Sequence, residues 1–397
     1  MRKDWEVKKL GDLSISLKNG LTIKQDKSGC GIPVTRIETL SNGIFNRDKL
    51  GYANIYDKEQ YCDYILDDKD LLISHINSKQ YVGRTVLYRK AENESIIHGM
   101  NLLRLKLNND FTLPEFIVYY FKSSYIKEQI RKYRKDAVNQ SSISITDINK
   151  IRLFVPPLQT QQQIVEELDC LTSIIEKQKK QLEELDNLAQ AIFYDMFGEP
   201  MENEKGWNIK KLEDIVHKNC TLSYGIVQPM EDVVDGVPIV RPIDLIDTFV
   251  SDTSLKRTRK EISNKYKRTI LTGHEILLCV RGTTGIVSLV NESFAGYNVT
   301  RGIVPILLSS LYNRWFVYYQ IKTSSIQQKI SELTYGIALR QINIKDLRAL
   351  TLITPPLSLQ QQFASKIEAI EKQKELIKKS IKETEDLFNS RMDYCFN

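Results

Sequence analysis

The feature that most constrains the fold is that the chain carries one sequence pattern twice. The nine residues from Trp5 (WEVKKLGDL) resemble the nine from Trp207 (WNIKKLEDI), and VPPLQTQQQ at 155–163 resembles TPPLSLQQQ at 354–362. Matching segments stay 199 to 205 residues apart along the chain. A match that keeps its register through half of 397 residues predicts two copies of one fold rather than one large domain.

The two copies differ in a patterned way. Their ends and their expected helices agree, whereas the segments from about 20 to 65 and from about 220 to 270 barely resemble each other. A shared scaffold that carries two different surfaces predicts two different recognition targets.

Each copy is expected to contain a strand, a polar loop, a second strand and then a helix. The apolar runs 70–74 and 275–279 are each followed by a polar, glycine-containing loop and another apolar run. Helices are expected over 113–131 and 311–331, with their aromatic residues placed mainly in the core and base stacking as the less favoured interpretation.

Each copy ends in a long amphipathic helix that begins after a Pro-Pro pair. The first helix is expected to end near Phe197, because Gly198 and Pro200 follow, and its span is roughly 57 Å at about 1.5 Å per residue. Apolar residues recur at alternating steps of three and four, as in a coiled coil. The expected helix–helix seam consists of Ile164, Leu168, Leu171, Ile175, Leu182, Leu185 and Ile192 in the first helix and Phe363, Ile367, Ile370, Ile377, Ile381 and Phe388 in the second.

These patterns predict an α+β fold with a pseudo-twofold internal repeat. Two similar globular α/β-type domains would be separated by two long antiparallel coiled-coil helices, which would act as a spacer. The expected segments are a first domain at 1–155, a first helix at 156–198, a second domain at 199–354 and a second helix at 355–397.

Composition narrows the class of partner and compartment. The net charge of +6 is mildly basic and fits a partner with phosphate groups without requiring one. The six cysteines form no Cys-x-x-Cys pair, so reduced thiols are expected rather than a zinc ribbon or a disulfide scaffold. The sequence contains no apolar run of 18 residues and no leader-like start, so a cytoplasmic protein that does not contact the membrane is expected.

No catalytic motif is evident in the sequence. The two Pro-Pro sites lack the preceding Asp or Asn and the following aromatic residue of an adenine methyltransferase loop. A GxGxxG cofactor loop, a P-loop and a His-Glu-x-x-His motif are missing, and the four histidines are far apart. We therefore expect a chain that is not an enzyme and that holds no metal and no cofactor.

The whole chain resembles the specificity subunit of type I restriction-modification enzymes. The resemblance rests on the Trp5 and Trp207 openings, on the Pro-Pro-Leu-x-x-Gln-Gln-Gln junctions at 156–163 and 355–362, and on the two long helices. It implies target-recognition domains that read an asymmetric, two-part site on double-stranded DNA. It also implies that two modification subunits dock on the helices, bind S-adenosylmethionine and methylate adenine at N6, with motor-nuclease subunits as an optional addition.

Basic and polar residues fall at corresponding places in the two copies, and these are the expected DNA contacts. For any single residue, a solvated surface position is an equally good interpretation. The candidates of the first copy are His75, Asn77, Lys79, Gln80, Arg84, Arg131, Lys132, Arg134, Lys135, Asn139 and Gln140. Those of the second copy are Arg281, Thr283, Thr284, Tyr335, Arg340 and Gln341, with Lys256, Arg257, Arg259, Lys265, Lys267 and Arg268 as a phosphate track.

Two alternatives belong to other classes. One is a coiled-coil scaffold that presents two different protein-binding domains. The other is a DNA-binding accessory of another phage-defence complex. The scaffold does not explain why basic, polar loops recur at equivalent positions, so DNA recognition is the preferred hypothesis.

Overall fold

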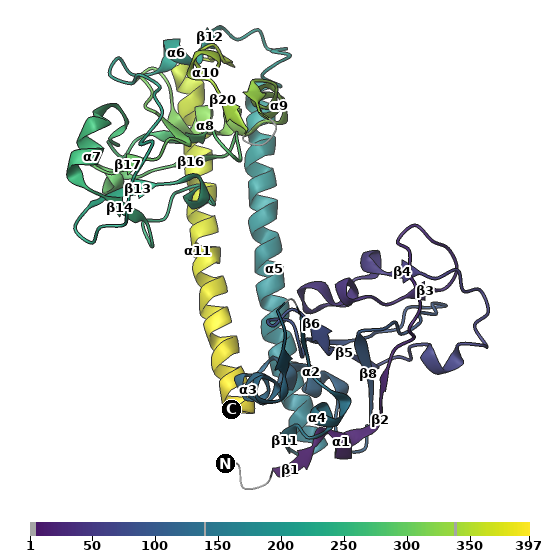
Figure 1. Ribbon diagram of the computed structural model, residues 1–397. Coiled ribbons are helices and arrows are strands. Elements are labelled where there is room, and N and C mark those ends of the chain that lie inside the picture. Colours follow the sequence, from purple (N-terminus) through teal and green to yellow (C-terminus); the bar gives the residue numbers. More distant parts are fainter. Residues whose placement is uncertain (1–4, 139, 337–339) are drawn as a thin grey trace. The chain divides into compact units, whose positions relative to one another are not determined.

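The computed structural model describes residues 5–138, 140–336 and 340–397. The chain divides into two compact units (Figure 1). Unit 1 comprises Met1–Gln178 and Lys379–Asn397, and unit 2 comprises Lys179–Lys378. Each unit therefore contains one globular part and one half of each long helix.

The core of unit 1 is a four-stranded antiparallel sheet in the order β2-β8-β5-β7. Leu71 and Ile73 of β5 point into the larger hydrophobic core, whereas Leu72 points into a smaller one on the other face. Because successive side chains of a strand alternate between faces, β5 is buried on both sides, as its continuous apolar run predicts. The four strands are β2 (Ser14–Asn19), β5 (Leu71–Ser74), β7 (Thr85–Leu87) and β8 (Leu102–Leu107).

Shorter elements surround this sheet. The helices are α1 (Leu10–Leu13), α2 (Pro114–Lys122), α3 (Ser124–Tyr133) and α4 (Ile145–Asn149), with 3-10 turns η1 (Ile37–Gly43), η2 (Arg47–Lys49) and η3 (Cys62–Tyr64). The remaining strands are β1 (Glu6–Lys9), β3 (Pro33–Val34), β4 (Gly51–Tyr52), β6 (Ile76–Asn77), β9 (Lys135–Asp136), β10 (Ser141–Ser142) and β11 (Arg152–Val155). Strand β1 pairs with β11, so the start of the globular part lies beside the start of the long helix.

Unit 2 repeats this arrangement. Its central sheet has the order β16-β15-β18, and β12 pairs with β21 as β1 pairs with β11. A second sheet, β14-β13-β17, includes a parallel pair between β13 and β17. The strands are β12 (Ile209–Lys211), β13 (Val237–Val240), β14 (Lys256–Thr258), β15 (Ile276–Cys279), β16 (Val287–Leu289), β17 (Asn298–Val299), β18 (Ile303–Ile306), β19 (Thr334–Tyr335), β20 (Gln341–Ile342) and β21 (Thr351–Ile353).

The shorter helices of unit 2 follow the order seen in unit 1, with α7 as an additional helix. They are α6 (Leu212–Ile215), α7 (Lys260–Lys265), α8 (Arg314–Lys322), α9 (Ser324–Glu332) and α10 (Ile344–Arg348), with 3-10 turns η4 (Pro242–Asp244), η5 (Lys267–Thr269) and η6 (Glu292–Phe294). The α+β fold with two repeated domains, predicted from the sequence, is confirmed.

The single helices expected at 113–131 and 311–331 are each two helices, which corrects the prediction. The backbone is extended at Ser123 and Thr323, and each hydroxyl accepts a hydrogen bond from the amide three residues later. Serine and threonine are preferred at this N-cap position, because their side-chain oxygen accepts a hydrogen bond from a backbone amide that has no partner within the new helix. The aromatic residues of α2 and α8 lie in the core as expected, with Phe116, Tyr120 and Phe316 buried.

The long helices α5 (Leu158–Phe197) and α11 (Leu357–Phe396) pack together in antiparallel directions within each unit. In unit 1, Gln178 Nε2 donates to Ser380 Oγ at 2.8 Å, and Arg391 Nε lies 2.6 Å from a Glu167 carboxylate oxygen. In unit 2, the Phe193 and Phe363 rings lie 5.7 Å apart. Along these pairs the residue number increases on α5 and decreases on α11, so the two helices run in opposite directions.

The expected seam residues differ in burial. Ile164, Leu168, Leu171, Phe363, Ile367, Ile370 and Ile381 are buried, whereas Ile175, Leu182, Leu185, Ile192, Ile377 and Phe388 are half-buried. Near the end of α5 the fully buried face is formed by Phe193 and Phe197, and Phe193 lies one position beyond the expected Ile192. The reason is that this face packs against Phe316 of α8 as well as against α11.

Candidate nucleic-acid interface

In unit 1, two candidate segments that are far apart in sequence form one small sheet. Strand β6 follows the buried strand β5, and it pairs with β10 so that Asn77 lies opposite Ser141. Strand β10 also pairs with β9, and this places Ser141 opposite Asp136. The loop after β5 and the β9–β10 hairpin therefore present a shared surface.

In unit 2, the equivalent segments meet in the same way. Arg281 forms a β-bridge with Gln341, and the Gly282 amide donates to the Arg340 carbonyl at 2.9 Å. In the β19–β20 hairpin, Tyr335 lies opposite Gln341. The two units thus place a loop and a hairpin together by the same backbone pairing.

A glycine in each unit turns the loop back into the sheet. Gly83 and Gly285 have φ values of 87° and 95°, a region that favours glycine. A Cβ would lie 2.3 Å from Ile130 Cδ1 at the first position and 2.5 Å from Gln327 Oε1 at the second. The backbone conformation therefore favours glycine at both positions, and a Cβ would also force the ends of these two side chains to move.

The side chains on the two hairpins are chemically different. In unit 1, the Asp136 carboxylate accepts from Arg134 Nε at 2.5 Å and from Ser141 Oγ at 2.7 Å, and Lys79 Nζ lies 3.3 Å away. The hydrogen bonds from Arg134 and Ser141 hold the pKa of Asp136 well below its usual range, so the carboxylate is charged at neutral pH. Unit 1 therefore presents a charged network.

In unit 2, neutral groups occupy the equivalent positions. Gln341 Nε2 donates to the Tyr335 hydroxyl at 2.9 Å, and that hydroxyl donates to Asn343 Oδ1 at 2.7 Å. Tyr335 is 46% exposed, so the network lies at the surface. The same cross-strand pair is thus Asp136–Ser141 in one unit and Tyr335–Gln341 in the other.

Most unit 1 candidates are exposed, and some are held within the protein. The exposed residues are Lys79, Gln80, Arg131, Lys132, Lys135 and Gln140, and Asn139 lies outside the described residues. Asn77 Nδ2 donates to Ser74 Oγ at 3.0 Å. The Arg84 guanidinium stacks on Tyr81 and donates to the Leu40 carbonyl at 3.1 Å.

His75 and Arg134 have little access to a ligand. His75 is 8% exposed, and burial lowers its pKa, so a neutral imidazole is favoured. The Arg134 side chain is 9% exposed and ion-paired with Asp136. These two residues support the hairpin and are weaker contact candidates than their exposed neighbours.

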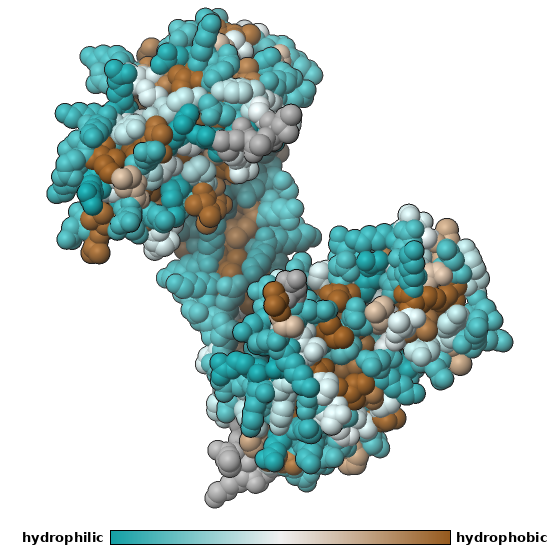
Figure 2. Space-filling view, viewed as in Figure 1, coloured by the Kyte–Doolittle hydropathy of each residue, from teal (hydrophilic) through white to brown (hydrophobic). Residues whose placement is uncertain are grey.

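The basic track of unit 2 lies on β14, α7 and η5, outside the hairpin sheet. Lys256, Arg257, Arg259, Lys265, Lys267 and Arg268 are all exposed. Within the described ranges, none of them has a carboxylate at ion-pair distance. Figure 2 shows mainly hydrophilic surface with scattered apolar patches on the visible faces of both units, which fits a charged, hydrated partner.

Sequence reasoning missed Tyr224, Arg301 and Asn343. Tyr224 and Arg301 line a shallow cavity of about 510 Å³ next to α10. Tyr224 also donates to the carbonyl of Ile342 in β20 at 2.6 Å. Tyr224 falls in the segment where the two copies differ, so the repeat carries no signal for it. Asn343 lies two residues after Gln341, and this spacing could have suggested it.

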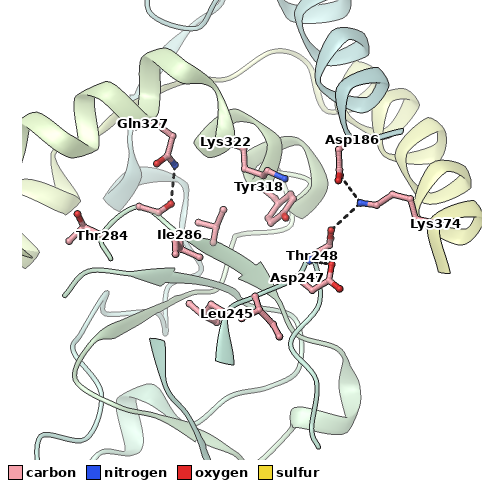
Figure 3. Close-up of a pocket in the computed structure, with 13 residues that line it drawn as sticks. Asp186, Leu245, Asp247, Thr248, Thr284, Ile286, Tyr318, Lys322, Gln327 and Lys374 are labelled. Carbon is pink, nitrogen blue, oxygen red and sulfur yellow. Dashed lines mark hydrogen bonds and ion pairs between the residues drawn. The ribbon is translucent and has the colours of Figure 1, made fainter. Parts of the chain in front are cut away.

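A second cavity in unit 2, of about 390 Å³, is lined in part by a buried ion-pair cluster around Lys374 (Figure 3). Lys374 of α11 donates to Asp186 Oδ1 at 2.7 Å and to Glu371 Oε1 at 2.8 Å, although its side chain is only 3% exposed. Burial disfavours its ammonium, but the hydrogen bonds to Asp186 and Glu371 raise the pKa of Lys374, which stays charged. Carboxylates already neutralise this cation, so we do not assign it to phosphate binding.

In the parts of the chain that the structure describes, no cluster of three or more His, Cys, Asp or Glu side chains could hold a metal ion. None of the described helices combines the length and apolarity needed to cross a bilayer.

Comparison with known proteins gives one consistent result. A family model described as the type I restriction modification DNA specificity domain matches residues 2–186 and again 204–386. A provisionally named type I restriction enzyme MjaX specificity subunit of Methanocaldococcus jannaschii is 29% identical over 97% of the chain and 92% of its own length. The EcoKI specificity subunit of Escherichia coli K12 is 32% identical over 48% of the chain and 42% of its own length.

Solved structures share the fold across the whole chain. An S subunit from M. genitalium covers 99% of the chain and 96% of its own, with a TM-score of 0.54 and 12% identity. A second chain comes from a study of complex assembly and conformational transition in the type I R-M system. It covers 100% and 98%, with a TM-score of 0.59 and 16% identity. At these identities, the likeness concerns the fold.

Proposed function

Because the chain belongs to the family of type I restriction-modification DNA specificity subunits, we propose that it reads an asymmetric, two-part DNA site, with one part contacted by each unit. As a specificity subunit it is a recognition component rather than a catalytic one, and it carries no cofactor. Family membership disfavours a scaffold without DNA binding and an accessory of another defence complex.

The observation that carries this proposal is the pair of unlike hairpins. The same backbone pairing places Asp136 opposite Ser141 in unit 1 and Tyr335 opposite Gln341 in unit 2. A carboxylate-centred cross-strand pair and an amide–phenol pair offer different donors and acceptors to base edges. Two such readers on one chain favour two different half-sites over a palindrome.

Phosphate contacts are assigned to the exposed basic residues. In unit 1, Lys135 lies in strand β9 of the hairpin, Lys132 precedes it and Lys79 lies beside Asp136, and the track on β14, α7 and η5 serves unit 2. Such contacts set affinity and register and make binding fall as salt rises. Base reading is assigned to Gln80 and Gln140 in unit 1 and to Thr283, Arg340 and Gln341 in unit 2.

Chemistry is assigned to partner subunits. The chain assembles into a type I restriction-modification complex. We propose that two methyltransferase subunits dock on α5 and α11 and use S-adenosylmethionine to methylate adenine, with motor-nuclease subunits as a further addition. The four segments 1–155, 156–198, 199–354 and 355–397 serve as recognition domain, helix, recognition domain and helix.

The test is to co-express the full chain with its methyltransferase subunit in a host that lacks adenine methylation and to map methylated adenines by long-read sequencing. The expected motif has two specified parts of different sequence, separated by unspecified bases. The methyltransferase subunit alone is the control and should give no such motif. A continuous motif or a palindrome would contradict the proposal.

A further inference from the structure

We propose that Gln341 is a specificity-determining residue of unit 2 that presents its side-chain carbonyl oxygen as a fixed hydrogen-bond acceptor to an adenine of the target. Its orientation is set by a chain of side chains that ends at a carboxylate. This inference rests on the proposed function, because it assigns one base contact within the half-site that unit 2 reads.

The chain of hydrogen bonds begins at Asp346. A carboxylate can only accept hydrogen bonds, so the contact of 3.3 Å between Asp346 Oδ2 and Asn343 Nδ2 fixes which end of the Asn343 amide faces Asp346. Asn343 Oδ1 is therefore directed elsewhere, and it accepts the Tyr335 hydroxyl proton at 2.7 Å. These contacts determine which end of the Asn343 amide donates and in which direction the Tyr335 hydroxyl points.

The direction of the Tyr335 hydroxyl proton determines the orientation of the Gln341 side-chain amide. A phenol has one proton, and since Tyr335 gives it to Asn343, its oxygen can only accept from Gln341. The Gln341 amide nitrogen Nε2 donates a hydrogen bond to this oxygen at 2.9 Å. The amide nitrogen therefore faces Tyr335, and the carbonyl Oε1 is left as the outward group.

The surroundings of Gln341 leave this oxygen available. The neighbouring Tyr224 hydroxyl gives its proton to the Ile342 carbonyl, so towards Gln341 it can only accept, and it faces the Gln341 amide nitrogen rather than Oε1. Among the described residues, no donor lies within hydrogen-bond distance of Gln341 Oε1, and the side chain is partly exposed. An oriented acceptor without a partner is what a base reader presents before it meets DNA.

The backbone at this position is fixed on both sides. Gln341 pairs with Tyr335 in the hairpin and forms the β-bridge to Arg281, and the Ile342 amide donates to the Val280 carbonyl at 2.9 Å. The side chain therefore starts from a rigid strand, and rigid placement lowers the entropy lost when a contact forms.

The chemistry of the fixed amide selects adenine. In the major groove, adenine offers the N6 amino donor, which matches Gln341 Oε1, and beside it the N7 acceptor, which can take the second Nε2 hydrogen in place of Tyr224. Guanine and thymine present carbonyl acceptors, which would face another acceptor. Cytosine offers its N4 donor but lacks the adjacent acceptor, so it matches only one of the two groups.

The test measures sequence preference at single positions. The full chain in complex with its methyltransferase subunit selects duplexes from a random-sequence pool, and the selected sequences give the preference at each base. Tyr335→Phe keeps the ring and removes the hydroxyl, so the Gln341 amide is free to rotate. We expect the adenine preference to fall about tenfold at one position of the unit 2 half-site.

A second variant tests the same orientation of Gln341 by changing its side-chain amide to a carboxylate. Gln341→Glu has the same shape but can only accept, and we expect it to shift that position from adenine toward cytosine, whose N4 amine suits a carboxylate. The unit 1 half-site is the internal control, because both variants should leave its bases and its information content unchanged. The other positions of the unit 2 half-site report whether unit 2 is folded in each variant.

The outcomes separate this inference from the proposed function. A wild-type motif without two parts would contradict the proposed function itself. A two-part wild-type motif that Tyr335→Phe and Gln341→Glu both leave unchanged would overturn the assignment of Gln341. Equal loss at all positions of the unit 2 half-site would indicate a structural role for the network and would also overturn it.

Discussion

At the scale of single residues, one glutamine in each Gln-Gln-Gln run explains why the Pro-Pro-Leu motif recurs. Gln161 is fully buried, and its Nε2 donates to the carbonyls of Phe111 and Pro156 at 2.9 and 2.8 Å. Its Oε1 accepts from Thr112 Oγ1 and from the Leu113 amide at 3.1 and 2.9 Å. One amide thus joins the start of α5 to the start of α2.

Gln360 forms the equivalent clamp in unit 2. Its Nε2 donates to the Pro355 carbonyl at 2.8 Å, and its Oε1 accepts from the Asn313 amide at 2.9 Å. The next residues of the two runs, such as Gln163, are exposed. The sequence therefore preserves a buried hydrogen-bond junction, and the run as a whole is not a recognition element.

Removing this clamp should destabilise unit 1. Gln161→Ala leaves two carbonyls, one amide and the Thr112 hydroxyl without their partner, and we expect a loss of about 2–4 kcal/mol in unfolding free energy. Urea unfolding of the full chain, followed by circular dichroism and by tryptophan fluorescence, measures it. Gln163→Ala is the matched control and should change stability by less than about 0.5 kcal/mol. Equal effects of the two substitutions would show that the clamp adds nothing.

At the scale of elements, Lys374 is a polar break in the apolar stripe of α11. It is buried between Asp186 of α5 and Glu371 one turn away, and Thr248 of the globular part lies 3.5 Å from its Nζ. A buried charge is tolerated only when it is paired and hydrogen-bonded. This cluster therefore requires one alignment of α5, α11 and the loop that carries Thr248.

Lys374→Met tests the cluster. The substitution fits the volume but leaves Glu371, whose side chain is 12% exposed, without its cation. We expect a loss of about 2–3 kcal/mol, below the usual value for a broken buried pair because Asp186 is half-exposed. The double variant Lys374→Met/Glu371→Gln should recover most of that loss, and Lys372→Met, at an exposed position, should have little effect. A double variant as unstable as the single one would contradict this account.

The elements also show what the sequence could and could not predict. Heptad spacing predicted both long helices, and the continuous apolar runs predicted β5 and β15, because burial periodicity is a local property. The breaks at Ser123 and Thr323 were missed because a capping residue interrupts helical spacing by only one position. The pairing of β6 with β10 and the bridge from Arg281 to Gln341 join segments about 60 residues apart, and no local pattern encodes such pairing.

At the scale of the whole molecule, each globular part has its own core and its own contacts with the helices. In unit 1, the Phe116 and Phe396 rings lie 5.2 Å apart, and the Tyr119 hydroxyl donates to Asp169 Oδ1 at 2.5 Å. In unit 2, a separate core gathers Phe193, Phe316 and Phe363. Because neither core borrows residues from the other, the two recognition functions should be separable.

Exchange of residues 1–155 for those of another family member tests this separation. The junction lies between the end of β11 at Val155 and the start of α5 at Leu158, so both long helices keep their own sequence. A donor domain that retains Phe and Tyr at the positions of Phe116 and Tyr119 preserves the contacts with α5 and α11. Since base reading is assigned to surfaces built within each unit, we expect the methylated motif to change in one half only. The reciprocal exchange of 199–354 should change the other half, and long-read mapping of methylated adenines measures both. Changes in both halves from either exchange would show that the two units do not read DNA independently.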